Sequence, residues 1–195
     1  MSGIRVRSLK DLKHQRRRRS HSCWDHLLIA PLWPMHNVNL GTLLRTCDAV
    51  GVCLAVPKLP WVPEALARGN TLRRRTCVHS TGHDPVRWLV DQKTRAGTTI
   101  VGVELTDDAI RLADLPPARN RTVAVLGHER TGIPPEALDQ LDTAVEIPMI
   151  GTGASLNVAS PGRWCCTGWP DCSRSSVPHA TLEVLRLTVA EGPVG

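Results

Sequence analysis

Residues 27–50 read LLIAPLWPMHNVNLGTLLRTCDAV and contain a strand followed by a helix. The almost wholly apolar run Leu27 to Leu32 predicts a buried strand. From Leu40 to Val50 the apolar residues recur at helical spacing, which predicts an amphipathic helix. A strand followed by a helix is the repeating unit of α/β proteins with a parallel sheet.

The same alternation continues to residue 147. Further strands are predicted at Cys53 to Val56, Thr76 to His79, Thr99 to Glu104, Thr122 to Leu126 and Ala144 to Ile147, and helices at Pro63 to Arg68, at Asp84 to Arg95 and from Pro134 and Pro135 onward. This order predicts the α/β class, with a mostly parallel sheet flanked by helices on both faces. The ligand crevice of such sheets lies at the carboxyl ends of the strands.

The chain has 195 residues, of which 42% are hydrophobic and 22% charged. This length is enough for one domain with a sizeable core, and the composition excludes collagen-like, fibrous and wholly disordered proteins. No run approaches the roughly 18 apolar residues of a membrane span, and the basic N-terminus lacks the apolar stretch of a secretory signal. We therefore expect a soluble cytoplasmic protein.

The net charge of +6 is concentrated near the N-terminus. Residues 1–22 hold eight of the 24 basic side chains, including Arg16, Arg17, Arg18 and Arg19, and one of the 18 acidic ones. Residues 1–25 are therefore interpreted as a basic arm outside the folded domain. Two interpretations stay open: a solvated, disordered leader, or an arm that contacts RNA phosphates.

The cysteines and histidines predict no metal site. The seven cysteines are odd in number and form no C-x-x-C pair, so we interpret them as reduced thiols. His79 and His83 are the only histidines at ligand-like spacing, and we expect no third ligand nearby. A surface loop therefore explains this pair better than a metal centre does.

Three loops that follow predicted strands combine small and polar residues: Asn37 to Thr46, Leu126 to Gly132, and Ile147 to Ala159. In the first, Asn39 is placed to cap a helix, and Arg45 lies nearly two turns further on. The third loop contains Gly151-x-Gly153, as dinucleotide-binding loops do. However, Leu156 occupies the third glycine position and the acidic ribose partner is missing.

Taken together, in this order and at these distances, the three loops resemble the motifs of the SpoU (TrmH-like) branch of the SPOUT RNA methyltransferases. The resemblance covers about Leu27 to Ala159, roughly two thirds of the chain. It implies the SPOUT α/β-knot, in which the C-terminal part is threaded into a trefoil knot. It also implies a homodimer, S-adenosylmethionine as the methyl donor, and the ribose 2′-hydroxyl of tRNA or rRNA as the acceptor.

The resemblance also assigns roles to individual residues. The catalytic set that it implies is Asn39, Arg45, Glu129, Ser155 and Asn157. The cofactor cleft that it implies is lined by Leu126, Gly127, Ile147, Met149, Gly151, Leu156 and Asn157. RNA contacts would come from Arg45 and from the arginines at 16–19, with no membrane or metal involved.

The implied chemistry needs no metal, because the methyl group of a sulfonium is already activated. The enzyme must align the reactants and remove a proton from the ribose hydroxyl. A guanidinium stays protonated in proteins, so we expect Arg45 to bind the adjacent phosphate and to stabilise the developing alkoxide. Glu129 would pair with a basic side chain, while Ser155 and Asn157 would position Arg45 or the ribose.

The sequence departs from the family after Ala159, where an apolar helix normally completes the knot. Residues 160–172 read SPGRWCCTGWPDC, with two prolines, two glycines and no helical period. We therefore divide the chain into the arm, a SpoU-like domain at 26–159 and an atypical tail at 160–195. A knot without its last helix loses one wall of the cleft and part of a dimer surface.

Two other function classes remain open at this point. One is a catalytically impaired RNA-binding protein of the same fold, and the other is a nucleotide-dependent oxidoreductase. The chain contains no Tyr or Phe to indicate a base-stacking platform, so the sequence does not specify which RNA or which nucleotide is involved.

We predict that the tail from Ser160 onward is a frameshifted reading. A set of codons for the apolar helix Val-Ala-Gly-Ser-Leu-Val-Leu-Tyr-Arg-Val-Ala-Gly-Leu gives the residues from Ser160 to Asp171 once its first base is dropped. Resequencing the gene across the Ala159 codon should reveal the displaced frame. An intact frame that ends in this tail would contradict the hypothesis.

Overall fold

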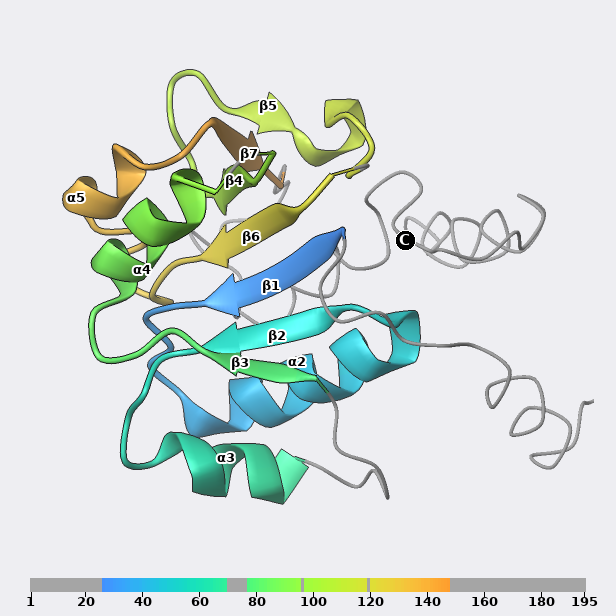
Figure 1. Ribbon diagram of the computed structural model, residues 1–195, viewed down its shortest axis with the longest axis vertical. Helices are drawn as coiled ribbons and strands as arrows, with labels where there is room; N and C mark the ends of the chain where they lie inside the picture. The colour runs from blue at the N-terminus through green and yellow to red at the C-terminus, as the bar shows by residue number, and fades with distance from the viewer. Residues whose placement is uncertain (1–25, 70–76, 96, 119, 148–195) are drawn as a thin grey trace, which may run out of the picture.

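The computed structural model describes residues 26–69, 77–95, 97–118 and 120–147 (Figure 1). The strands form one seven-stranded sheet in the order β3-β2-β1-β6-β4-β7-β5, and every pairing is parallel. Their bounds are β1 Leu27–Pro31, β2 Cys53–Val56, β3 Val78–Ser80, β4 Thr99–Val103, β5 Ile110–Arg111, β6 Thr122–Leu126 and β7 Thr143–Glu146. The predicted α/β class with a parallel sheet is confirmed.

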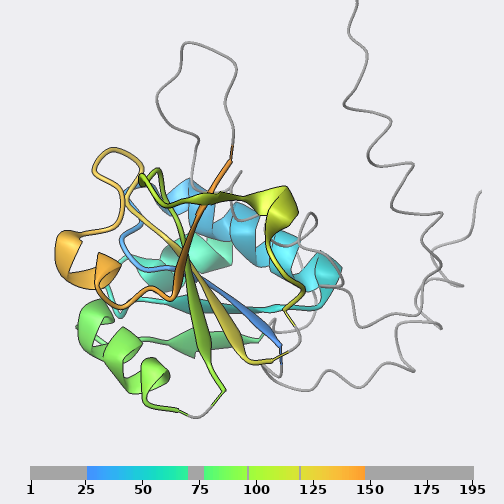
Figure 2. The same ribbon diagram turned by 90° about the horizontal axis from the view of Figure 1, so that it is seen from above.

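Helices cover both faces of the sheet, as Figure 2 shows. They are α2 Asn37–Val50, α3 Val62–Gly69, α4 Pro85–Lys93, the 3₁₀ helix η1 Leu112–Asp114, and α5 Pro135–Leu138. One face packs against apolar side chains of α2 and α3, including Leu43 and Ala65. The other packs against α4 and α5, including Leu89 and Ala137.

The central strands β1 and β6 are buried along their whole length. Their register pairs Leu28 with Val123 and Pro31 with Leu126. Strands covered on both faces bury successive side chains, and for this reason their sequences are continuous apolar runs. This pairing places the loops that follow β1 and β6 next to each other at one edge of the sheet.

Helix α2 begins earlier than the sequence predicts, and the expected cap is wrong. The helix starts at Asn37, and the residue at its N-cap is His36, whose side chain makes no capping hydrogen bond. Asn39 therefore lies inside the first turn, where its side chain is used for another contact. The helix ends at Val50, and the capping residue Gly51 takes a left-handed conformation with φ of 81° and donates its N–H to the Cys47 carbonyl oxygen.

The sequence patterns did not predict β5 and η1. Strand β5 has only two residues, which pair with β7 through Ile110 opposite Val145. A two-residue strand shows no measurable alternation, so tertiary pairing alone defines it. No described helix combines the length and the apolar character that crossing a bilayer requires. The basic arm, the predicted knot and the tail lie outside the described residues.

Candidate functional site

The loops after β1 and β6 are joined by the side chain of Glu129. Its Oε2 accepts a hydrogen bond from the Met35 backbone N–H at 2.7 Å. Its Oε1 accepts from Asn39 Nδ2 at 2.7 Å and from the His36 backbone N–H at 3.4 Å. Asn39 is only 4% exposed, so this carboxylate satisfies a buried amide that would otherwise lack a partner. The first and second predicted motifs thus meet in one contact.

The environment of Glu129 favours its ionised form. Partial burial raises the pKa of this carboxyl, but hydrogen bonds from the backbone of Met35, Glu129 itself and His36 and from the side chain of Asn39 outweigh burial. The net result is a pKa below the ordinary value. Among the described residues Glu129 accepts hydrogen bonds from amide groups and forms no ion pair, so the expected pairing with a basic side chain stays a prediction.

A tight loop holds Glu129 in place. His128 and Gly132 exchange backbone hydrogen bonds of 2.9 Å in both directions. His128 Nδ1 accepts from the backbone N–H groups of Arg130 and Thr131. A Cβ on Gly127 would lie 2.4 Å from the Gly132 carbonyl carbon, so no side chain fits at this position. The loop is therefore fixed by backbone contacts on both sides.

Glu104, which the sequence patterns did not single out, supports the same loop from β4. Its Oε2 accepts from the Ile133 backbone N–H at 2.7 Å, and its Oε1 accepts from the Leu105 N–H. Gly132 has a φ of 71°, and a Cβ there would lie 2.3 Å from Glu104 Oε2. The only sequence signal for this role is an acidic residue at the carboxyl end of a predicted strand.

Three of the predicted cofactor-cleft residues lie at the same edge of the sheet. Leu126 ends β6 and Ile147 follows β7, and both strands pair with β4. Leu126 and Ile147 belong to one apolar cluster and are almost fully buried, while Gly127 is half-buried. The predicted residues outside the described part of the chain are Met149, Gly151, Ser155, Leu156, Asn157 and the four arginines of the arm.

Arg45 lies apart from the Asn39–Glu129 contact. Six helical residues rotate it about 120° around α2 from Asn39. It is exposed and lines a hollow of about 180 Å³ between α2 and α3, together with Asn37, Val38, Gly41, Thr42, Ala65 and Arg68. Within the described ranges no hydrogen bond or ion pair links Arg45 to Asn39 or Glu129. No pattern in the sequence indicates that Arg68 belongs to this hollow.

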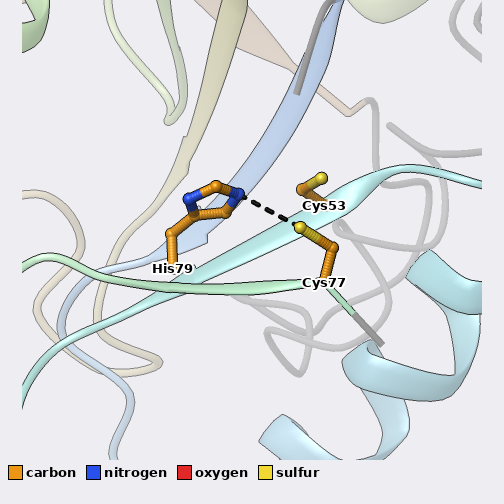
Figure 3. A group of neighbouring side chains, drawn as sticks. All are labelled: Cys53, Cys77 and His79. Atoms are coloured by element: carbon orange, nitrogen blue, oxygen red, sulfur yellow. Dashed lines mark hydrogen bonds between the residues drawn. The ribbon is translucent and has the colours of Figure 1, made fainter. Parts of the chain in front are cut away.

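The expectation that His79 has no third ligand near it is wrong. Cys53, Cys77 and His79 bring their Sγ and imidazole nitrogen atoms within 4.8 Å of one another (Figure 3). Cys77 lies only two residues before His79 in the sequence. The pairing of β2 with β3 brings Cys53 to the other two residues.

These features define a parallel α/β protein with a carboxylate-organised polar site at the carboxyl edge of its sheet. Residues 27–166 match the model of the SpoU rRNA Methylase family, and the chain belongs to this family. A tRNA (guanosine(18)-2′-O)-methyltransferase of Thermus thermophilus is 34% identical over 125 residues, which cover 62% of each protein. The mouse tRNA (guanosine(18)-2′-O)-methyltransferase TARBP1 is 34% identical over 127 residues, 64% of this chain and 8% of TARBP1. The chain spans less than two thirds of the length of these curated relatives.

Solved structures show the same fold. The A. aeolicus TrmH/SpoU tRNA modifying enzyme superimposes with a TM-score of 0.62 at 22% identity, covering 94% of this chain and 98% of that one. AviRb of Streptomyces viridochromogenes, solved in complex with the cofactor AdoMet, gives 0.60 at 19% identity, covering 88% and 61%. At these identities the superpositions establish the arrangement of the chain and no residue roles.

We predict that Gly127→Ala destabilises the protein by about 1–3 kcal/mol or more, because the added methyl group would overlap backbone atoms that cannot move independently. Gly51→Ala is the matched control. It also replaces a glycine by alanine, but at a position with open space and positive φ, where only the backbone penalty of about 1 kcal/mol applies. Urea unfolding of both variants measures the difference. Equal losses of unfolding free energy in the two variants would contradict the close backbone contact at Gly127.

We predict that Glu129→Gln lowers the free energy of unfolding by about 1–3 kcal/mol near neutral pH, since charge-assisted hydrogen bonds are lost. A lowered pKa in the folded state means that the carboxylate stabilises the protein above its ordinary pKa of 4.5. This stabilisation is lost as the pH falls through the folded-state value. The difference in the free energy of unfolding between wild type and Glu129→Gln should therefore become smaller below about pH 4.5.

Denaturant unfolding measured from about pH 3 to 7 tests this dependence. Glu136→Gln is the matched control, because Glu136 is an exposed glutamate on α5 that accepts no hydrogen bond within the described ranges. Its unfolding curve should follow that of wild type at every pH. A pH-independent gap for Glu129→Gln would show that the charge of this carboxylate is not what organises the loops.

Proposed function

We propose that this chain is an S-adenosylmethionine-dependent RNA methyltransferase that methylates a ribose 2′-hydroxyl. The observation that carries the proposal is the Glu129 contact, which joins two of the three predicted motifs at the edge of the sheet where parallel α/β proteins bind ligands. Membership of the SpoU family supports it. The names of the curated relatives, which are tRNA 2′-O-methyltransferases, support it further.

The described residues support the proposed cofactor cleft from inside the protein. Leu126 and Ile147 are almost fully buried in one apolar cluster, and the Gly132 backbone fills the space that a Gly127 side chain would need, so the three residues form a closely packed base for the cleft. When bound, S-adenosylmethionine supplies an activated methyl group. Met149, Gly151, Leu156 and Asn157 are proposed to complete the cleft, and Ser155 and Asn157 to orient the ribose.

In this proposal Arg45 acts on the RNA. Its guanidinium is exposed in the hollow between α2 and α3, where Asn37 and Thr42 supply further polar groups. A guanidinium binds a phosphate through two hydrogen bonds and stays charged. It can therefore hold the phosphate beside the target ribose and stabilise the negative charge that develops on the 2′-oxygen. The departing proton would pass to that phosphate or to water.

The position of Arg45 favours a homodimer. Asn39 and Arg45 face different directions from α2, so one copy does not bring Arg45 to its own Glu129 loop. A second copy that supplies Arg45 to the cleft of the first would resolve this separation. The proposed active site is therefore shared between two chains.

We favour tRNA over rRNA as the substrate, because the curated relatives above carry the tRNA (guanosine(18)-2′-O)-methyltransferase name. The arginines at 16–19 would contribute non-specific phosphate contacts. We place the protein in the cytoplasm, where tRNA is modified. A catalytically impaired RNA-binding protein is the second candidate, and the departure of the sequence after Ala159 is the observation that favours it.

Methyl transfer and cofactor binding together test the proposal. Calorimetry should show binding of S-adenosylmethionine but not NAD, and labelled methyl groups should appear on the 2′-oxygen of tRNA. Arg45→Ala should reduce kcat/KM for tRNA at least about 100-fold, as loss of one charge-stabilising donor does, and leave cofactor affinity unchanged. RNA binding without cofactor binding would support the second candidate.

Arg87→Ala is the matched control, because Arg87 is an exposed arginine on α4, which packs on the opposite face of the sheet from α2. It should methylate tRNA at the wild-type rate. Mixing inactive Arg45→Ala chains with inactive Asn157→Ala chains should restore activity if the site is shared between copies. An Arg45→Ala protein with the normal rate would remove Arg45 from the mechanism.

A further inference from the structure

Two cysteines and a histidine form a cluster on the half of the sheet made by β2 and β3 (Figure 3). The Sγ of Cys77 lies 3.3 Å from Nε2 of His79. The Sγ of Cys53 completes a group in which all three ligand atoms lie within 4.8 Å of one another. Cys53 is buried, whereas Cys77 and His79 are half-buried, so the cluster is partly open to solvent.

Strand pairing produces the cluster. The register of β2 and β3 places Leu54 opposite Val78 and Ala55 opposite His79, and the Leu54 N–H donates to the Cys77 carbonyl at 3.1 Å. Side chains two residues apart on a strand share a face, so Cys77 and His79 point the same way. Cys53 stands beside Cys77 on the neighbouring strand. Hydrogen-bonded backbone therefore fixes all three positions.

We propose that Cys53, Cys77 and His79 bind a zinc ion. Zinc takes thiolates at about 2.3 Å and imidazole nitrogen at about 2.0–2.1 Å, and in a tetrahedral site such ligands lie about 3.5–3.8 Å apart. The observed separations of 3.3 Å and of at most 4.8 Å lie close to this geometry.

The charges also favour a zinc ion at this position. Two thiolates and a neutral imidazole balance the two positive charges of the ion, so the occupied site is neutral overall. Neutrality matters because Cys53 is only 1% exposed, and an unpaired thiolate there would be costly. Three protein ligands leave the fourth tetrahedral position for water. Thiolate and imidazole donors select zinc over magnesium or calcium, which prefer oxygen.

This site is separate from the one that carries the proposed methyl transfer. Cys53 begins β2 and Cys77 precedes β3, so the thiols lie toward the amino ends of these strands. The Asn39–Glu129 contact lies at the carboxyl end of β1. The bound ion would link the edge strand β3 to β2. Zinc binding at this site does not depend on which RNA is bound or on methyl transfer.

Zinc and cobalt titrations of the full chain test the proposal. They use a parent variant in which the cysteines outside the described residues, Cys23, Cys165, Cys166 and Cys172, are replaced by serine. This parent should bind one equivalent of Zn²⁺, and Co²⁺ should give a thiolate-to-cobalt charge-transfer band of a tetrahedral site. Cys77→Ser and His79→Ala in the same background should each weaken zinc binding more than about 100-fold, beyond the effect of losing an outer-shell partner.

Two matched controls distinguish the cluster from its surroundings. Cys47→Ser removes another buried thiol, and His83→Ala removes the other histidine near β3; both should bind zinc like the parent. His79→Cys should restore binding, with a stronger cobalt–thiolate band from the third sulfur. Far-ultraviolet circular dichroism of each variant checks that substitution at the half-buried positions 77 and 79 leaves the fold intact.

Three results would overturn the zinc site. One is a parent that binds no zinc while folded. Another is cobalt binding that is unchanged by both Cys77→Ser and His79→Ala. The third is a Cys53–Cys77 disulfide in protein isolated without oxidant, detected by mass spectrometry after alkylation. None of these outcomes bears on methyl transfer, so the two proposals fail independently.

Discussion

The hydrogen bonds that converge on the Glu129 carboxylate hold the two loops of the site together. The loops after β1 and β6 are more than ninety positions apart in the chain, and their strands are adjacent in the sheet. The backbone N–H groups of Met35 and His36, just before α2, and the side-chain amide of Asn39 in its first turn all donate to Glu129. One ionised carboxylate from the neighbouring loop therefore holds both loops together.

The two parts of the proposed site differ in how tightly they are held. The loop from Gly127 to Gly132 is closed by backbone contacts and supported by Glu104. Arg45, by contrast, is exposed in the hollow between α2 and α3. A closed loop and an exposed cation on different sides of α2 are consistent with the proposed reaction only if a second copy of the chain brings the cation to the cleft.

The parallel sheet brings distant residues together at both of its ends. At the carboxyl end, the order β1-β6-β4-β7 aligns Leu126, Ile147 and the Glu129 loop. Toward the amino end, the β2–β3 pair assembles two thiols and an imidazole, although Cys53 begins β2 and Cys77 lies just before β3. A metal at the second location would stabilise an edge strand of only three residues, which has a neighbour on one side only.

The α/β class, the parallel sheet and the longer elements could all be predicted from the amino-acid sequence, because strands covered on both faces need continuous apolar runs and amphipathic helices need a 3.6-residue period. The resemblance of the motifs to those of the SpoU family also implied Asn39 and Glu129 as site residues, and the structure brings these two residues into contact. The partner of Glu129, the role of Glu104, the strand β5 and the cluster at Cys53 emerged from the folded structure alone. Hydrogen bonds and ligand distances depend on strand order and register, which local periodicity does not encode.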